Sequence, residues 1–295
     1  MLMIRPYPRV GESQAGYALR LAAENDYENG LEDLRKLLGH KCVHRVTYWR
    51  DETMNYLLGR RFSYENIPLR YCGANGQFRL TYNSKLIDSY HYSRHSQKYC
   101  PQCIKESPYF RGDWDLSFVT VCDIHQCILV DHCEQCNRPV SWKRRSHLHC
   151  NCGHPMSETQ INTPTKPEVI AIQKLILASL FDRQADPEIF VAFPELFALK
   201  DIKNGEIGKR IIEGFYRYAR TEGKFSVNSS IPLPVTLIHE AVLLFSTVVF
   251  TSNFVPNFAA WSCSQRFSLC ATRLQLKGAI SPLSTGQFTA ESAVH

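Results

Sequence analysis

The chain has 295 residues, of which 44% are hydrophobic and 12% aromatic, and this composition excludes an intrinsically disordered protein. Its formal net charge of +6 is mild, so it permits contact with nucleic acid without requiring it. Because no secretory signal is recognisable and the longest apolar stretch, residues 235–250, contains His239 and Glu240 and is too short for a membrane span, we expect a cytoplasmic protein without a membrane partner.

The first hundred residues predict short helices separated by tight turns. Ser13 is a suitable N-cap for the first helix, and Gly39 ends a second one over residues 31–38. Two more helices are predicted over about residues 47–58 and 84–92. Such a region is compatible with a helix-turn-helix, and the equal alternative is a helical scaffold that touches no nucleic acid.

Helical patterns return after a plausible linker at residues 161–167. One helix is predicted from Pro167, another from Asp186 to Leu199, and a third over residues 205–221. A solvated helix face is the commoner explanation for the basic side of the third helix, but it also makes a candidate surface for nucleic acid or a partner. Its basic residues are Lys209, Arg210, Arg217 and Arg220.

The fold class expected from these patterns is mainly α, with small zinc-ribbon or zinc-knuckle modules between helical regions. We expect an N-terminal helix-turn-helix-like domain, tandem zinc modules, a C-terminal helical domain and an atypical tail. Their expected bounds are residues 1–96, 97–158, 166–250 and 251–295. The tail has few charges and no periodicity, which suggests either poor order or an altered reading frame at a truncated gene end.

Eight of the twelve cysteines cluster in the central region, as expected for metal binding rather than for disulfides. The first predicted quartet pairs Cys-Pro-Gln-Cys with a distant Cys-Asp-Ile-His, and the second pairs Cys-Glu-Gln-Cys with Cys-Asn-Cys-Gly. Two residues between ligands allow a tight knuckle that aims both side chains at one ion. The ligands are Cys100, Cys103, Cys122 and His125 for the first site, and Cys133, Cys136, Cys150 and Cys152 for the second.

Two complete quartets leave no open coordination position for a catalytic water, so we expect two structural Zn²⁺ ions and no enzyme. The nearby histidines that could substitute in the second site are His132, His147, His149 and His154. Ligand thiolates and zinc together lower the formal charge from +6 to about +3. A zinc-dependent nuclease or deaminase is a distant alternative, because the deaminase signature would need its Cys-x-x-Cys downstream of His132.

Other residues of the central region have less specific roles. Cys127 is interpreted as a small buried residue. The loop at Lys143, Arg144 and Arg145 is the densest basic cluster and is a candidate for contact with nucleic acid or an acidic partner. Aromatic residues are candidate interface anchors, and for Trp114 and Phe118 we favour packing under the first zinc. These candidate anchors are Trp49, Tyr109, Phe110, Trp114 and Trp142.

The order and spacing of these motifs resemble the TniQ family of transposon target-selection proteins over about residues 5–157. The resemblance rests on an opening with prolines, Glu-Ser and Arg-x-Ala, and on the central ligand series with Trp114 and Leu129 between its pairs. The opening residues are Pro6, Pro8, Glu12, Ser13, Arg20 and Ala22. No part beyond residue 157 can be matched motif by motif.

The resemblance implies a non-enzymatic, DNA-associated adaptor in target selection. Such proteins link target recognition to an AAA+ ATPase of the TnsC or TniB type, which recruits the transposase. Recognition in the family is either direct, on target DNA, or through an RNA-guided Cascade complex, sometimes with a TniQ homodimer. The alternative function is therefore a zinc and helix-turn-helix protein that reads the attachment site directly.

Overall fold

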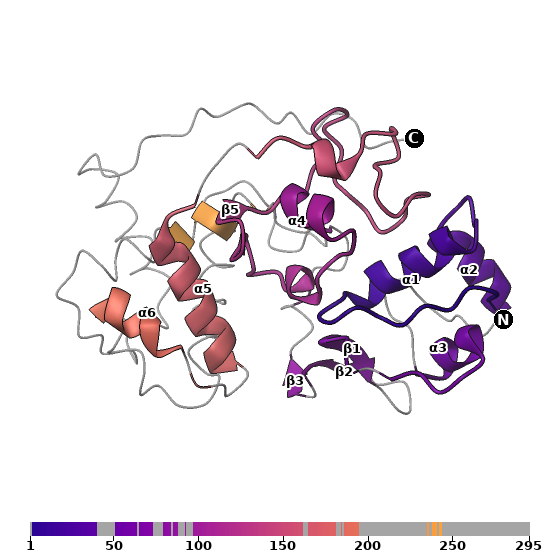
Figure 1. Cartoon of the computed structure of the whole chain (residues 1–295), viewed down its shortest axis with the longest axis horizontal. Helices are drawn as coiled ribbons and strands as arrows, with labels where there is room; N and C mark the ends of the chain where they lie inside the picture. Colours follow the sequence, from indigo (N-terminus) through magenta and orange to yellow (C-terminus); the bar gives the residue numbers. More distant parts are fainter. Residues whose placement is uncertain are drawn as a thin grey trace, which may run out of the picture.

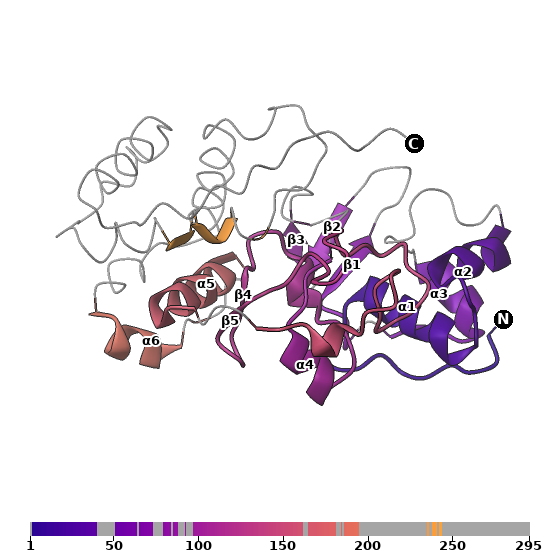
Figure 2. The same cartoon turned by 90° about the horizontal axis from the view of Figure 1, so that it is seen from above.

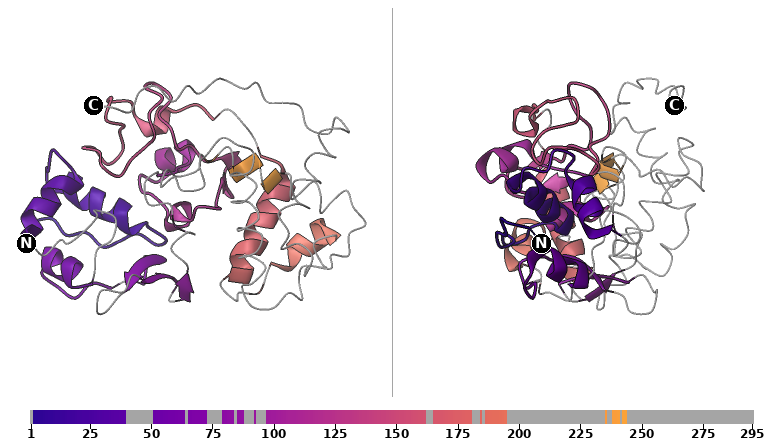
Figure 3. Two further views of the ribbon diagram at one scale, coloured as in Figure 1. Left: turned by 180° about the vertical axis from the view of Figure 1, so that it is seen from behind. Right: turned by 90° about the vertical axis from the view of Figure 1, so that its right-hand side faces the viewer.

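A computed structural model describes the chain over residues 2–39, 51–63, 65–72, 79–83, 85–87, 92, 97–161, 165–180, 184, 186–194, 235, 238–240 and 242–243. Helices α1–α3 lie at one end of this part, α5 and α6 lie at the other, and the cysteine-rich region lies between them (Figures 1 and 2). The view from behind shows the same order (Figure 3). No helix in the described part is long and apolar enough to cross a membrane.

Three of the four helices predicted in the first hundred residues are present. They are α1 (Gln14–Glu24), α2 (Leu31–Leu38) and α3 (Asp51–Leu58), and residues 47–50 lie outside the described part. The Ser13 hydroxyl accepts a hydrogen bond from the Gly16 amide, as expected of an N-cap. The helix-turn-helix stays a prediction, because residues 40–50 between α2 and α3 lie outside the described part.

A small antiparallel sheet is present, and its last strand occupies residues 85–87, where the sequence predicted part of a helix over residues 84–92. Its strands are β1 (Leu69–Cys72), β2 (Arg79–Tyr82) and β3 (Lys85–Ile87), in the order β1-β2-β3. Asn83 has a left-handed φ of 47°, which reverses the chain after β2 and pairs Leu80 with Ile87. The helix prediction was wrong at β3 because it overlooked this turn.

The central region contains little regular structure. It consists of α4 (Pro101–Glu106), a 3₁₀ turn η3 (Gly112–Asp115), the short hairpin of β4 (Val121–Cys122) and β5 (Cys127–Ile128), and a second turn η4 (Met156–Glu158). With so few backbone ladders, this region needs another source of stability.

Two of the three predicted carboxy-terminal helices fall on described residues, and residues 205–221 do not. Helix α5 (Pro167–Leu180) begins at the predicted proline, and α6 (Pro187–Ala192) is capped by the Asp186 carboxylate. Helix α6 ends well before Leu199, because Pro194 disfavours helical geometry at Phe193.

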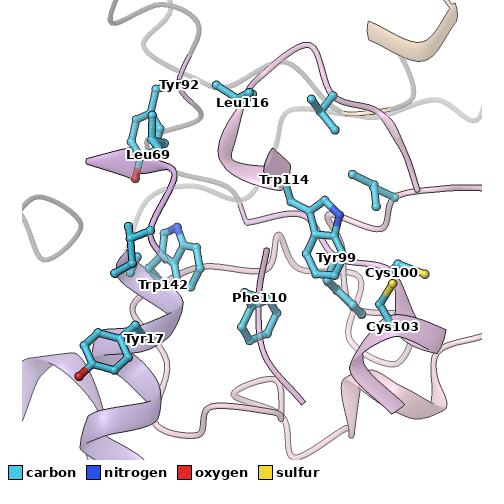
Figure 4. Close-up of a cluster of buried hydrophobic side chains, with 14 of the residues drawn as sticks. Tyr17, Leu69, Tyr92, Tyr99, Cys100, Cys103, Phe110, Trp114, Leu116 and Trp142 are labelled. Carbon is cyan, nitrogen blue, oxygen red and sulfur yellow. The ribbon is translucent and has the colours of Figure 1, made fainter. Parts of the chain in front are cut away.

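The amino-terminal helices and the cysteine-rich region share one hydrophobic core. Phe110 lies between Tyr99 and Trp142, at ring distances of 6.5 and 5.7 Å, and Trp114 lies beside the cysteines of α4 (Figure 4). Phe110 and Trp142 are almost fully buried, so their interpretation as interface anchors was wrong. Trp114 and Phe118 are also buried, which agrees with the packing role that we favoured for them. Trp49 lies outside the described residues.

Gly30 marks a close approach between α2 and the cysteine-rich region. Its φ of +58° is unfavourable for any residue with a Cβ, and an added Cβ would lie 2.4 Å from the Arg144 carbonyl oxygen. Gly39 has a similar φ of +55°, but no described atom lies within 4 Å of its Cβ position. A comparison of alanine substitutions at the two glycines therefore separates the cost of backbone strain from the cost of steric overlap.

We expect Gly30→Ala to destabilise the protein more than Gly39→Ala. The strained φ costs about 1–3 kcal/mol in both variants, and the overlap with Arg144 adds to it only at Gly30. Urea denaturation of the two variants measures the difference. Equal midpoints would show that the contact at Gly30 relaxes without cost.

Candidate metal centres

The first cluster is assembled by α4 and the β4–β5 hairpin. Cys100 is the N-cap of α4 and Cys103 lies in its first turn, because Pro101 is favourable at the start of a helix. Cys122 ends β4, and His125 follows in the turn that Gln126 closes with a φ of 50°. The hairpin thus brings the second ligand pair to the first.

The donor atoms of this cluster fit a tetrahedral ion. All four lie within 4.8 Å of one another. Cys103 Sγ lies 3.6 Å from Cys122 Sγ, and His125 Nδ1 lies 3.4, 3.2 and 3.7 Å from the sulfurs of Cys100, Cys103 and Cys122. An ion with metal–sulfur bonds of about 2.3 Å places tetrahedral sulfurs roughly 3.8 Å apart. The site therefore suits an ion of zinc size.

Glu106 orients the histidine of the first cluster. Its Oε1 lies 3.0 Å from His125 Nε2, so the Nε2 proton is donated to the carboxylate and Nδ1 faces the sulfurs. Glu106 is the last residue of α4, the helix that also carries Cys103. The sequence contained this carboxylate, but nothing in the spacing linked it to His125.

We expect Glu106→Gln to weaken metal binding at the first site by about 10–100-fold, the usual effect of losing an outer partner of a metal-bound histidine. Competition with a chromogenic chelator measures this affinity. Glu134→Gln, beside the second cluster, is the matched control, because Glu134 bonds to the Gln160 amide instead of a ligand. Equal metal affinities of the two variants would show that Glu106 does not contribute to metal binding.

Cys127 lies beside the first cluster. Its side chain is almost fully buried, as predicted, but its Sγ is 3.6 Å from Cys100 Sγ. Nothing in the cysteine spacing placed Cys127 there, because it continues no Cys-x-x-Cys pair.

The second cluster is also complete but more exposed. Cys133 Sγ lies 3.6 Å from Cys152 Sγ and Cys136 Sγ lies 3.7 Å from Cys150 Sγ, and all four donors lie within 4.8 Å of one another. Gly153 has a φ of +93°, the conformation that the sequence required after a Cys-x-Cys pair. Cys152 is exposed, whereas the first cluster is nearly all buried.

The four histidines near the second cluster have other surroundings in the described structure. His132 Nδ1 bonds to the Asp131 carboxylate, His149 Nδ1 to the Ser146 hydroxyl, and His154 Nε2 to the Thr159 hydroxyl. His147 packs edge-on to Phe110, and burial lowers its pKa to about 3. The four cysteines are therefore the group that can hold a metal.

The three basic residues at positions 143–145 differ in their exposure to solvent. Lys143 and Arg145 are exposed. Arg144 is buried, because its guanidinium donates to Gln97 Oε1 and to the carbonyl oxygens of Ser141, Ser146 and His147. Burial lowers the pKa of Arg144 to about 9. As a binding residue Arg144 was wrongly predicted: it holds the loop between the cysteine pairs of the second cluster.

A buried lysine holds the chain segment that leads into β4. Lys98 Nζ donates to the carbonyl oxygens of Leu116, Ser117 and Val119, at 2.5, 3.3 and 2.6 Å. Burial lowers the pKa of Lys98 to about 7. The sequence did not point to Lys98, because an isolated lysine usually indicates a residue on the protein surface.

The predicted basic helix over residues 205–221 lies outside the described residues. Its basic residues are Lys209, Arg210, Arg217 and Arg220.

The part of the chain that contains the first cluster matches a known protein family. Residues 3–129 match the model of the TniQ family. The match ends before the second cluster begins at Cys133. No curated protein matches the chain.

Proposed function

Because this chain belongs to the TniQ family over residues 3–129, it is a transposition-associated protein, and we propose that it acts as a non-enzymatic adaptor in target selection. The adaptor links a target-recognition complex to an AAA+ regulator that recruits the transposase. Both metal clusters have four donors and hence no open position for a reacting water, which supports a role without catalysis.

The metal we propose for both clusters is Zn²⁺. Thiolate-rich sets of four donors at tetrahedral spacing favour zinc over hard, oxygen-preferring cations. The ions are structural and hold the platform from which the partner surfaces project.

The observation that carries the adaptor proposal is an exposed segment at the amino end, which we call the amino-terminal ridge (residues 3–10). Its large apolar members Met3, Tyr7 and Val10 are 92%, 71% and 76% exposed. Arg5 and Arg9 are exposed as well, and the ridge contains no acidic residue. Methionine, aromatic residues and arginine are enriched at protein interfaces, so the ridge suits a partner with apolar and acidic side chains.

The backbone of the ridge is held by side chains from α1 and from residues farther along the chain. The Tyr17 hydroxyl donates to the Pro6 carbonyl at 2.7 Å, and Arg20 donates to the Tyr7 carbonyl at 3.0 Å. Further donors are Asn66 to Pro8 O, Tyr109 to Val10 O, and Asn25 to Ile4 O. Since these bonds fix the ridge before a partner arrives, binding would cost little conformational entropy.

The test is binding of the purified chain to the AAA+ regulator of its own element. We expect the double variant Tyr7→Ala/Val10→Ala to weaken binding at least 10-fold, because exposed aromatic anchors dominate interface energy. Val191→Ala is the matched control, since Val191 is 81% exposed on α6, far from the ridge along the chain. Unchanged binding of the double variant would refute the ridge as the regulator's docking surface.

The alternative is direct reading of target DNA, and the exposed Lys143 and Arg145 beside the second cluster favour it. Direct phosphate contacts make affinity fall steeply with salt, whereas an adaptor binds DNA weakly by itself. Gel shifts over a salt series, with and without a Cascade complex, separate the two. Tight, site-specific binding by the lone chain would establish the direct reader.

A further inference from the structure

The first metal cluster has a fifth donor that the quartet does not use. The Sγ–Sγ distance between Cys127 and Cys100 is 3.6 Å, the same as between the two ligands Cys103 and Cys122. Sulfurs bound to one tetrahedral ion are roughly 3.8 Å apart, so Cys127 and Cys100 have the spacing of two ligands of the same ion.

The pairing of β4 with β5 fixes the direction of the Cys127 side chain. Cys122 and Cys127 are directly opposite each other in this antiparallel pair. Opposite residues project from the same face of a sheet, so both cysteines face the ion position. Cys127 is 1% exposed, which keeps its sulfur inside the cluster and away from solvent.

We propose that Cys127 is a reserve metal ligand, which replaces His125 and converts the first site from three sulfurs and one nitrogen to four sulfurs. His125 is the ligand to be replaced, because Cys127 lies beside two of the three cysteine ligands that would remain. Its Sγ is 3.6 Å from Cys100 Sγ, and it is paired with Cys122 in the hairpin. His125 is also the ligand whose outer partner, Glu106, is exposed on the surface. A fourth thiolate in place of the neutral imidazole makes the filled site one charge more negative.

The second cluster has no such reserve among the described residues. Its four cysteines are all used, and the other cysteines whose side chains the structure describes belong to the region of the first cluster. The two clusters therefore respond differently to the loss of one ligand: the first retains its ion and the second does not.

The test is the metal content of full-length variants, measured by mass spectrometry, followed by replacement of zinc with Co²⁺. We expect the wild type and His125→Ala to hold two ions, and His125→Ala/Cys127→Ala and Cys136→Ala to hold one. The thiolate-to-cobalt absorption of the whole protein should rise by about one seventh in His125→Ala, because the first site goes from three Co–S bonds to four while the second site keeps its four. Cys127→Ala alone keeps two ions and the wild-type absorption.

Three results would overturn the proposal. One is His125→Ala with a single ion, and another is His125→Ala with two ions but no stronger cobalt absorption, which indicates water in the vacant position. The third is a double variant that keeps both ions. Misfolding of His125→Ala counts against the proposal too, because a set of four sulfurs should close the site without the histidine.

Discussion

Removal of both metal ions by a high-affinity chelator is expected to unfold the region of residues 97–161. This region has one short helix and a hairpin of two-residue strands, so its ladders cannot hold it together. Structural zinc contributes about 10–16 kcal/mol of apparent binding free energy per site, more than the whole stability of an ordinary domain. Near-UV circular dichroism should lose its tryptophan signal, because Trp114 and Trp142 are buried there.

The loss should extend to α1, which depends on the same region. The Ser13 amide donates to the Phe110 carbonyl at 2.7 Å, and the Ser13 hydroxyl donates to the buried Asp115 carboxylate at 2.5 Å. Hydrogen exchange of α1 amides before and after chelation measures this dependence, and added Zn²⁺ should restore protection. A chelated protein with unchanged tryptophan signal and α1 protection would show that the core folds without metal.

The two candidate metal clusters were predictable because each pair of donors is local, although the pairs that form one cluster are distant in sequence. Two residues between cysteines define a knuckle, and a glycine after Cys152 permits the positive φ that its turn adopts. The helices with clear caps, at Ser13 and Asp186, were predictable for the same reason. Each of these features depends on residues within one or two turns of the chain.

What sequence analysis missed depends on contacts between distant residues. Arg144 is buried because Gln97, far away in sequence, and nearby loop carbonyls surround it, so its charge could not be interpreted from the neighbouring Lys143 and Arg145. Cys127 lies beside the first cluster because a hairpin with strands of only two residues pairs it with Cys122. Neither contact leaves a periodic pattern in the sequence.

The amino-terminal ridge was also not predictable, since exposure of apolar residues is evident only once the core is known. Met3, Tyr7 and Val10 resemble core residues in the sequence. The structure instead directs the prolines inward, with Pro8 buried and Pro6 partly buried, and leaves the residues between them in solvent. Prolines restrict the preceding residue to extended conformations, and this keeps the backbone of the ridge extended.

The second large effect is expected at the buried ion pair between Arg20 and Glu12. Glu12 is fully buried, and its two carboxylate oxygens accept from Arg20 Nε and Nη2, each at 2.8 Å. Arg20→Ala leaves the Glu12 charge buried without its partner, so we expect a loss of about 3–5 kcal/mol in the free energy of unfolding. Urea denaturation measures it.

Glu24 provides the control for this pair, because it bonds to the same arginine at 2.9 Å but its side chain is 36% exposed. Glu24→Gln should cost about 0–1 kcal/mol, as exposed ion pairs do. Since Arg20 also holds the Tyr7 carbonyl, the proposed docking of an AAA+ regulator on the ridge predicts that Arg20→Ala weakens this binding even at temperatures where the variant stays folded. A folded Arg20→Ala variant with normal regulator binding would mean that the partner orders the ridge by itself, and that the fixed backbone of residues 3–10 contributes nothing to affinity.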